Sequence, residues 1–235
     1  MANVEATQNH LLQQLAKSDR VSYERLFEDL RPTPLERGAL LGATRERTDW
    51  VYFVNSGIVS LVAGTSSGHS LEVAIVGKEG LAGLEGARGS RALPYRLIVQ
   101  LPGLAYRIRA EAINEHVFSS HALHELLMVH SQFLMRQITQ SAVCSRFHSS
   151  VQRLARWLLL TSERAGTDHL HLTHEFVAQM VGAPRSAVTH AAAQLRSKGV
   201  VEYRRGVITI RNRKRLHQTS CECFDAVSSA RQDVG

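Results

Sequence analysis

The stretch from residue 173 to residue 210, THEFVAQMVGAPRSAVTHAAAQLRSKGVVEYRRGVITI, constrains the fold more than any other part of the chain. Thr173 is a typical N-cap, Gly182 ends the first helix, and Pro184 suits the first position of the next helix, where its missing N–H costs nothing. Apolar residues recur at helical spacing on both sides of Gly182. The pattern predicts a helix-turn-helix, with helices at 173–181 and 184–198.

A pair of short strands follows this motif. Residues 200–203 and 207–210 have strand character, and the tip between them is Arg204-Arg205-Gly206. The surrounding segment, residues 149–217, carries 12 Lys or Arg and 4 Asp or Glu, whereas the rest of the chain carries 16 and 17. The excess positive charge therefore lies in this segment. It is suited to phosphate backbones or to an anionic membrane, and a solvated basic face is the alternative.

The second predicted helix has small residues on one side and polar residues on the other. A helix of this kind can enter the major groove of DNA, where its N-terminal residues reach the base edges. We predict that the base-reading residues are Arg185, Ser186, Thr189 and His190. The two arginines of the strand pair, Arg204 and Arg205, are predicted to contact backbone phosphates, so that the pair serves as a wing.

The first half of the chain shows a different pattern. Residues 8–30 have helical spacing that stops at Arg31-Pro32-Thr33-Pro34, and several short β-rich runs with glycine turns between residues 50 and 108 predict a sandwich or roll. Residues 112–147 are helical with a wide apolar band, which indicates packing on two partners, one of them a second copy of the chain. A single buried helix in one core is the alternative. The predicted dimer residues are Leu123, Leu127, His130, Leu134 and Ile138.

This order of elements, together with the segment LTHEFVAQMVGAPRSAVTHAAAQLRSKGVVEYRRGVITI, resembles the Crp/Fnr family of bacterial transcription regulators over nearly the whole chain. The resemblance implies an α+β fold. A cyclic-nucleotide-binding-like β-roll (jelly roll) would occupy residues 1–118, a long dimerisation helix residues 119–148, and a winged helix-turn-helix residues 149–235. It also implies a homodimer on a near-palindromic operator in double-stranded DNA, with RNA polymerase and a small-molecule effector as further partners.

The resemblance carries over to individual residues only in part. The guanine-reading arginine of the family falls on Arg185, and its phosphate contacts at the start of the first helix fall on Thr173 and His174. The family often has Glu and Arg where this chain has Ser186 and His190, so we expect a different half-site.

The predicted sensor half departs further from the family. Its two nucleotide-holding motifs line up with Gly80-Leu81-Ala82 and Arg96-Leu97-Ile98, which lack the ribose-binding glutamate and the phosphate-binding hydroxyl. A buried ribose hydroxyl without a partner is costly, so we expect no cyclic AMP binding. The pocket for an unidentified effector is predicted at Glu79, Gly80 and Arg96, although Arg96 alternatively forms an ion pair or lies at the surface.

Several other classes of protein and site receive little support. No signal peptide or membrane-spanning run is present, and three cysteines are too few for a disulfide scaffold, so we expect a cytoplasmic protein without membrane association. His217, Cys221 and Cys223 are a weak metal signal, and Cys144 reads as core; we predict no metal and no cofactor. No catalytic spacing stands out, so we predict no enzyme. An effector-binding module whose winged helix contacts proteins is the alternative function.

Overall fold

The computed structural model describes residues 7–87, 92–204 and 206–231. The chain forms two compact units. Among the described residues, the first unit comprises 7–61, 74–135 and 230–231, and the second comprises 62–73 and 136–229. Among the described helices, none is long and apolar enough to cross a membrane.

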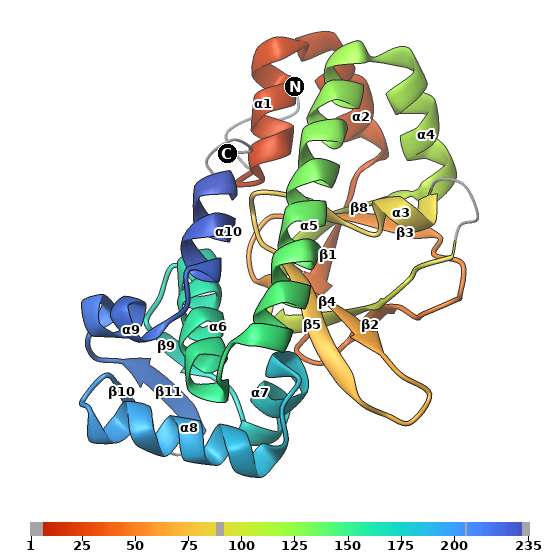
Figure 1. Cartoon of the computed structure of the whole chain (residues 1–235). Helices are drawn as coiled ribbons and strands as arrows, with labels where there is room; N and C mark the ends of the chain where they lie inside the picture. The colour runs from red at the N-terminus through yellow and green to blue at the C-terminus, as the bar shows by residue number, and fades with distance from the viewer. Residues whose placement is uncertain (1–6, 88–91, 205, 232–235) are drawn as a thin grey trace. The chain divides into compact units, whose positions relative to one another are not determined.

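The first unit contains the predicted β-roll (Figure 1). Two helices, α1 (His10–Ser18) and α2 (Arg20–Asp29), precede it, and each is capped by the side chain before it, Asn9 or Asp19. One antiparallel sheet has the order β1 (Arg31–Leu35), β8 (Gly103–Arg109), β3 (Trp50–Val54), β6 (Leu81–Ala82). The other has the order β2 (Leu40–Gly42), β7 (Arg96–Leu101), β4 (Ile58–Gly64), β5 (Ser70–Val76), and a short helix α3 spans Leu84–Ala87.

The segment that the sequence predicts as a helix stop is itself a strand. Residues Arg31–Leu35 form β1, with Pro32 opposite Tyr106 and Pro34 opposite Leu104 of β8. β1 lies at the edge of its sheet. Proline lacks a backbone donor and is therefore confined to positions such as this edge, where one side of the strand has no hydrogen-bonding neighbour.

Helix α4 (Ala110–Ser119) leads into the long helix α5 (His121–Phe147), in agreement with the helix expected at 119–148. Leu123, Leu127, His130 and Leu134 are all at least 97% buried within the single chain, and Ile138 is half-buried. Their stripe thus packs on the chain itself rather than forming a free face, because side chains already removed from water have little surface left for a second copy. The large apolar residues exposed on α5 are Met128, Val129, Met135, Val143 and Phe147.

The second unit is built around α6 (Ser150–Ala165), which begins at a capping box of Ser149 and Gln152 and ends at left-handed Gly166. A three-stranded antiparallel sheet has the order β10 (Val201–Arg204), β11 (Val207–Ile210), β9 (His169–His171) (Figure 1). Helices α7 (His174–Val181) and α8 (Arg185–Ser197) form the helix-turn-helix. Their buried faces carry Val177, Met180, Val188, Ala191 and Leu195.

Two details differ from the sequence-based expectation. Pro184 is the N-cap residue of α8, with extended backbone at φ −55° and ψ 142°, so the helix begins at Arg185 instead of at the proline. The residues after the wing form two further helices, α9 (Arg213–Thr219) and α10 (Cys223–Arg231). The buried side chains of Leu216, Phe224 and Val227 explain why this segment packs onto the unit.

Candidate nucleic-acid interface

The turn between α7 and α8 is fixed by local backbone geometry and by one arginine. Gly182 adopts φ +63°, a left-handed conformation that glycine accepts without strain, and its N–H donates to the carbonyl of Ala178. Arg153 on α6 donates to the carbonyls of Val181 and Gly182, the latter at 3.1 Å. The carbonyls at the end of α7 are therefore satisfied, and the position of α8 after them is well determined.

The outer face of α8 presents the four predicted base-reading side chains together. Arg185, Ser186, Thr189 and His190 are all exposed, whereas Val188, Ala191 and Leu195 on the opposite face are buried. Helical spacing places positions i, i+1, i+4 and i+5 on one side, so the four residues share the N-terminal half of one face. This is the part of a helix that first meets the base edges when it enters a major groove.

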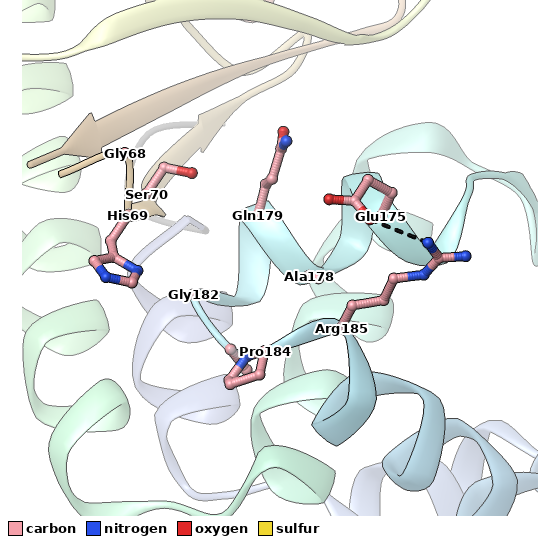
Figure 2. A pocket seen from close by; sticks show the side chains of 10 residues that line it. Gly68, His69, Ser70, Glu175, Ala178, Gln179, Gly182, Pro184 and Arg185 are labelled. Atoms are coloured by element: carbon pink, nitrogen blue, oxygen red, sulfur yellow. Dashed lines mark ion pairs between the residues drawn. The ribbon is translucent and has the colours of Figure 1, made fainter.

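Arg185 makes a contact within the helix-turn-helix. Its guanidinium lies 3.6 Å from the carboxylate of Glu175 on α7, and Figure 2 shows the two side chains pointing toward each other. Both side chains are more than half exposed, and exposed ion pairs contribute little to stability. The pair borders a hollow of about 420 Å³, which is also lined by Gly68, His69 and Gln179. A stronger anionic or base partner could therefore take Arg185 from Glu175 at small cost.

His174, at the start of α7, contacts the reading face as well as the wing. Its ring lies edge-on to Tyr203 at 4.5 Å between centroids, and Nδ1 is 3.4 Å from the hydroxyl of Thr189. Burial, together with the positive charge of Arg185, lowers the pKa of His174. The ring is therefore biased toward its neutral form. The neighbouring Thr173 is exposed and uses its hydroxyl to cap α7, accepting from the N–H of Phe176 at 3.2 Å.

The wing forms at the predicted place. Arg204 ends β10, is exposed, and pairs in register with Val207 of β11, while Gly206 turns the chain with φ +79°. Glu202 and Arg211 form an ion pair beside it, with the Nε of Arg211 at 2.8 Å. Arg205, the other predicted phosphate contact, lies outside the described residues.

The residues predicted to bind an effector, Glu79, Gly80 and Arg96, all lie in the first unit. Glu79 is buried and accepts from the N–H of Gly77 at 3.2 Å. Gly80 lies against His130 of α5, so closely that a Cβ there would come within 2.2 Å of the imidazole Cε1. Arg96 is half-buried at the start of β7. Leu81 is fully buried, and its carbonyl is 2.9 Å from His130 Nε2.

Three side chains of the interface were not predicted from the sequence. Arg196 lies seven residues after Thr189 on the exposed face of α8 and borders a small hollow of about 130 Å³ with His174 and Tyr203. Its helical spacing could have revealed it. Glu175 and Arg153 act through partners on other helices, 10 and 28 or more residues away, and no local pattern points to those pairings.

This arrangement is similar to that of known proteins. Residues 152–219 match the family model of the Crp-like helix-turn-helix domain. Among solved structures, a protein from Eubacterium rectale described as a transcriptional regulator of the crp/fnr family has 18% identity and a TM-score of 0.71, covering 86% of this chain and 95% of its own. None of the curated proteins matches the sequence.

Two further structures have the same fold. FixK2 from Bradyrhizobium japonicum has 17% identity and a TM-score of 0.70, covering 82% of this chain and 98% of its own. CLP from Xanthomonas campestris, described as a c-di-GMP responsive global regulator, has 17% identity and a TM-score of 0.67, covering 83% and 100%. Residues 152–219 therefore form a Crp-like helix-turn-helix domain, and the chain as a whole has the fold of Crp/Fnr-family transcription regulators.

Proposed function

We propose that this protein is a homodimeric transcription regulator that binds a near-palindromic operator with α8 in the major groove. The observation that carries the proposal is the shared exposed face of Arg185, Ser186, Thr189 and His190 on the first two turns of α8. A bidentate contact from Arg185 to O6 and N7 of guanine is the strongest single base contact that this face can make. Ser186 and His190 then give this protein a half-site sequence that differs from the usual one of the family.

The backbone contacts come from the two ends of the motif. Thr173 and His174 lie at the N-terminus of α7, where the helix dipole favours a phosphate. Arg204 is exposed at the tip of the wing and reaches for a neighbouring phosphate, with Arg205 beside it in sequence. These contacts position the protein, while α8 supplies sequence discrimination.

The dimer face in this proposal is the exposed side of α5. Met128 and Met135 are seven residues apart, a spacing that keeps side chains on one seam of a helix pair, and Val143 follows near the same side. Met135 is 63% exposed, and exposed apolar side chains that gather on one surface mark interaction sites. Two copies packed along α5 would remove this stripe from water.

The dimer face is tested by Met135→Glu, because a carboxylate in an apolar helix pair is costly to bury. We expect wild type to sediment as a dimer and the variant as a monomer at micromolar concentration. Phe118→Glu is the matched control, since Phe118 is an 89% exposed residue of α4 and the same chemical change there leaves the dimer intact. A dimer that withstands Met135→Glu would exclude this face.

The effector in this proposal is a small molecule other than cyclic AMP. Leu81 and Leu97 line up with the positions of the polar holders and are fully buried, so neither side chain offers a hydrogen bond to a ribose or phosphate. RNA polymerase would be the further partner of the DNA-bound dimer.

DNA binding is tested by selecting the purified protein on a pool of random duplexes at one moderate salt concentration. We expect a two-fold-symmetric motif with half-sites about one helical turn apart. If no motif is enriched, the selection is repeated with cell extract, which supplies an effector. If a motif is enriched only when extract is present, the effector activates the dimer. If no motif is enriched with or without extract, the proposal is contradicted and a winged helix that contacts proteins is favoured.

A further inference from the structure

A cluster of three cysteines and one histidine lies in the second unit, away from the reading face of α8. Cys144, His148, Cys221 and Cys223 bring one potential ligand atom each to within 4.8 Å of one another. The three cysteines are at least 97% buried, and the His148 side chain is 11% exposed. The DNA-binding role uses none of these four residues.

Local structure explains how four residues from two distant segments meet. Cys144 is in the last turn of α5, and the N–H of His148 donates to its carbonyl at 3.2 Å, so that helical spacing puts both side chains on one side. Cys221 lies between α9 and α10, and Cys223 begins α10. The N–H of Phe224 donates to the carbonyl of Cys221 at 3.0 Å, a turn that brings the two thiols to the same side.

Two of the six separations between the ligand atoms match those of a tetrahedral metal centre, and all six are within 4.8 Å. With Zn–S bonds of about 2.3 Å and a Zn–N bond of about 2.0 Å, a tetrahedral zinc ion holds two sulfurs about 3.8 Å apart and a sulfur and a nitrogen about 3.5 Å apart. The observed Sγ–Sγ distance between Cys144 and Cys221 is 3.6 Å, and the distance from Cys223 Sγ to His148 Nδ1 is 3.5 Å.

We propose that Cys144, His148, Cys221 and Cys223 bind one zinc ion that ties the end of α5 to the α9–α10 segment. Three thiolates and one imidazole are a standard ligand set of closed structural zinc sites. Soft sulfur ligands favour zinc over the hard cations magnesium and calcium. Binding displaces the thiol protons to solvent, and zinc and three thiolates together leave a net charge of −1 at the site.

The surroundings suit this charge and orient the ligands. The other ring nitrogen of His148, Nε2, lies 3.2 Å from the carboxylate of Glu222, the usual arrangement behind a metal-binding imidazole. The side-chain amide of Gln140 donates to Cys223 Sγ at 3.0 Å. Arg153 and Arg156 of α6 are close enough to Cys144 to interact with it electrostatically, and their positive charge offsets the negative centre.

The sequence alone pairs a different histidine with the two C-terminal cysteines. His217 is four residues before Cys221, but its ring binds the carboxylate of Asp225 at 2.7 Å and packs on Phe224, and it is not part of the cluster. His217 therefore provides a matched control for His148. Both are histidines beside the same segment, and the proposal assigns the metal to only one of them.

The first test measures metal in the full-length protein, purified under reducing conditions from zinc-supplemented cells and passed over a desalting column. We expect one zinc per chain by elemental analysis, released when a mercurial reagent blocks the thiols. Cobalt(II) added to the metal-free protein should give the intense visible bands of tetrahedral coordination and the ultraviolet bands of thiolate-to-cobalt charge transfer. Both are recorded on wild type, so the result does not depend on a variant that folds poorly.

The second test assigns the ligands by zinc competition against a chromogenic chelator. His148→Gln should weaken zinc binding more than Glu222→Gln, which should weaken it by about 10-fold or more. His217→Gln should leave the affinity unchanged. We also expect zinc to raise the melting temperature of wild type, because a ligand that binds only the folded state stabilises it.

Several results would overturn the proposal. Wild-type protein that holds less than a tenth of an equivalent of zinc, and shows no tetrahedral cobalt spectrum, has no such site. A disulfide between Cys144 and Cys221 in protein kept under reducing conditions would assign the pair to redox chemistry. Equal losses of zinc affinity in His148→Gln and His217→Gln would show that His148 is not a specific zinc ligand.

Discussion

At the scale of single residues, two side chains contribute little to the stability of the fold, and their substitution therefore tests function most directly. Arg185 and His190 are exposed on α8, and their removal costs the fold no buried contact. Among the residues that the structure describes, the ion partner of Arg185 is the exposed carboxylate of Glu175, at 3.6 Å. Substitutions here therefore report on recognition and leave the free energy of unfolding nearly unchanged.

Replacing Arg185 with alanine should flatten base preference at one position of each half-site. A bidentate arginine–guanine pair contributes about 1–3 kcal/mol of discrimination, so affinity for the selected operator should fall by about 5- to 150-fold per half-site. Affinity for random duplex should change much less. Competition between specific and random duplexes in a gel-shift assay measures both.

Glu175→Gln is the control for this substitution, because it breaks the ion pair and keeps the arginine. We expect operator affinity in this variant to equal or exceed that of wild type. If Arg185→Ala retains its sequence preference, another residue of α8 reads the bases.

Gly182 and Gly199 form a matched pair for measuring how much unfolding free energy is lost when a side chain is added at the turn between α7 and α8. Both have positive φ, +63° and +66°, but a Cβ on Gly182 would lie 2.8 Å from Leu71 Cδ1, whereas one on Gly199 has nothing within 4 Å. Alanine at either position should cost about 1–2 kcal/mol for left-handed backbone. At Gly182 we expect about 1 kcal/mol more from the contact with Leu71.

These glycine costs can be measured by urea unfolding in a Trp50→Phe background, where Trp157 of α6 is the remaining tryptophan. Equal losses for Gly182→Ala and Gly199→Ala would mean that Leu71 moves aside freely, and that only backbone conformation matters at the turn.

At the scale of elements, α5 has two apolar faces, one buried and one exposed. One face is buried on its own chain and includes His130, which is fully buried beside Gly80 and Leu81 of the β-roll. The other carries Met128, Met135 and Val143 and is exposed. Periodicity gives the wide apolar band of such a helix, but it does not say which half of the band faces which partner.

His130 should make the stability of the first unit depend on pH. Burial lowers its pKa from the ordinary value of 6.5, against the opposing effects of the Leu81 carbonyl and of Glu85 and Glu79. The unfolded chain then binds the proton more readily than the folded chain. The stability from neutral His130 is thus present above about pH 6.5 and is lost as the pH falls below it.

The variant His130→Gln should flatten this dependence, even if its overall stability is lower. Melting temperatures between about pH 7.5 and about pH 5.5 check the slope. His121→Gln, at the exposed start of α5, should keep the slope of wild type. A steep slope that survives in His130→Gln would assign the pH dependence to another group.

At the scale of the whole molecule, the charge distribution predicts how the protein meets DNA. Residues 149–217 hold 12 basic and 4 acidic side chains, while the remainder is nearly balanced. Each phosphate that a cation neutralises releases counterions, so operator affinity should fall steeply and log-linearly with salt. The slope of log affinity against log salt concentration is proportional to the number of phosphate contacts.

Arg204→Ala should make this slope shallower by about 1 per protomer, or about 2 for a dimer, with base preference retained. Lys17→Ala is the control, because it removes one exposed positive charge from α1, outside the basic segment. Fluorescence anisotropy across a series of salt concentrations gives both slopes. Identical slopes for Arg204→Ala and wild type would show that the wing does not contact phosphate.

The sequence by itself determined the helix-turn-helix almost to the residue. The N-cap at Thr173 and the helix end at Gly182 were predicted and are observed. Each of these signals operates through hydrogen bonds or backbone preferences within four residues, which sequence shows directly. The placement of Pro184 differs by one position for the same reason, since N-cap and first-turn positions are adjacent.

Only the tertiary structure decided which side of α5 is buried, that Gly80 packs against His130, and that Cys144 and His148 meet Cys221 and Cys223. The thiols of Cys144 and Cys221 are 77 residues apart in sequence, and their partner histidine is His148 rather than the sequence neighbour His217. Such contacts depend on how whole elements pack, and packing is set by the summed burial of many side chains. No short stretch of sequence carries that information.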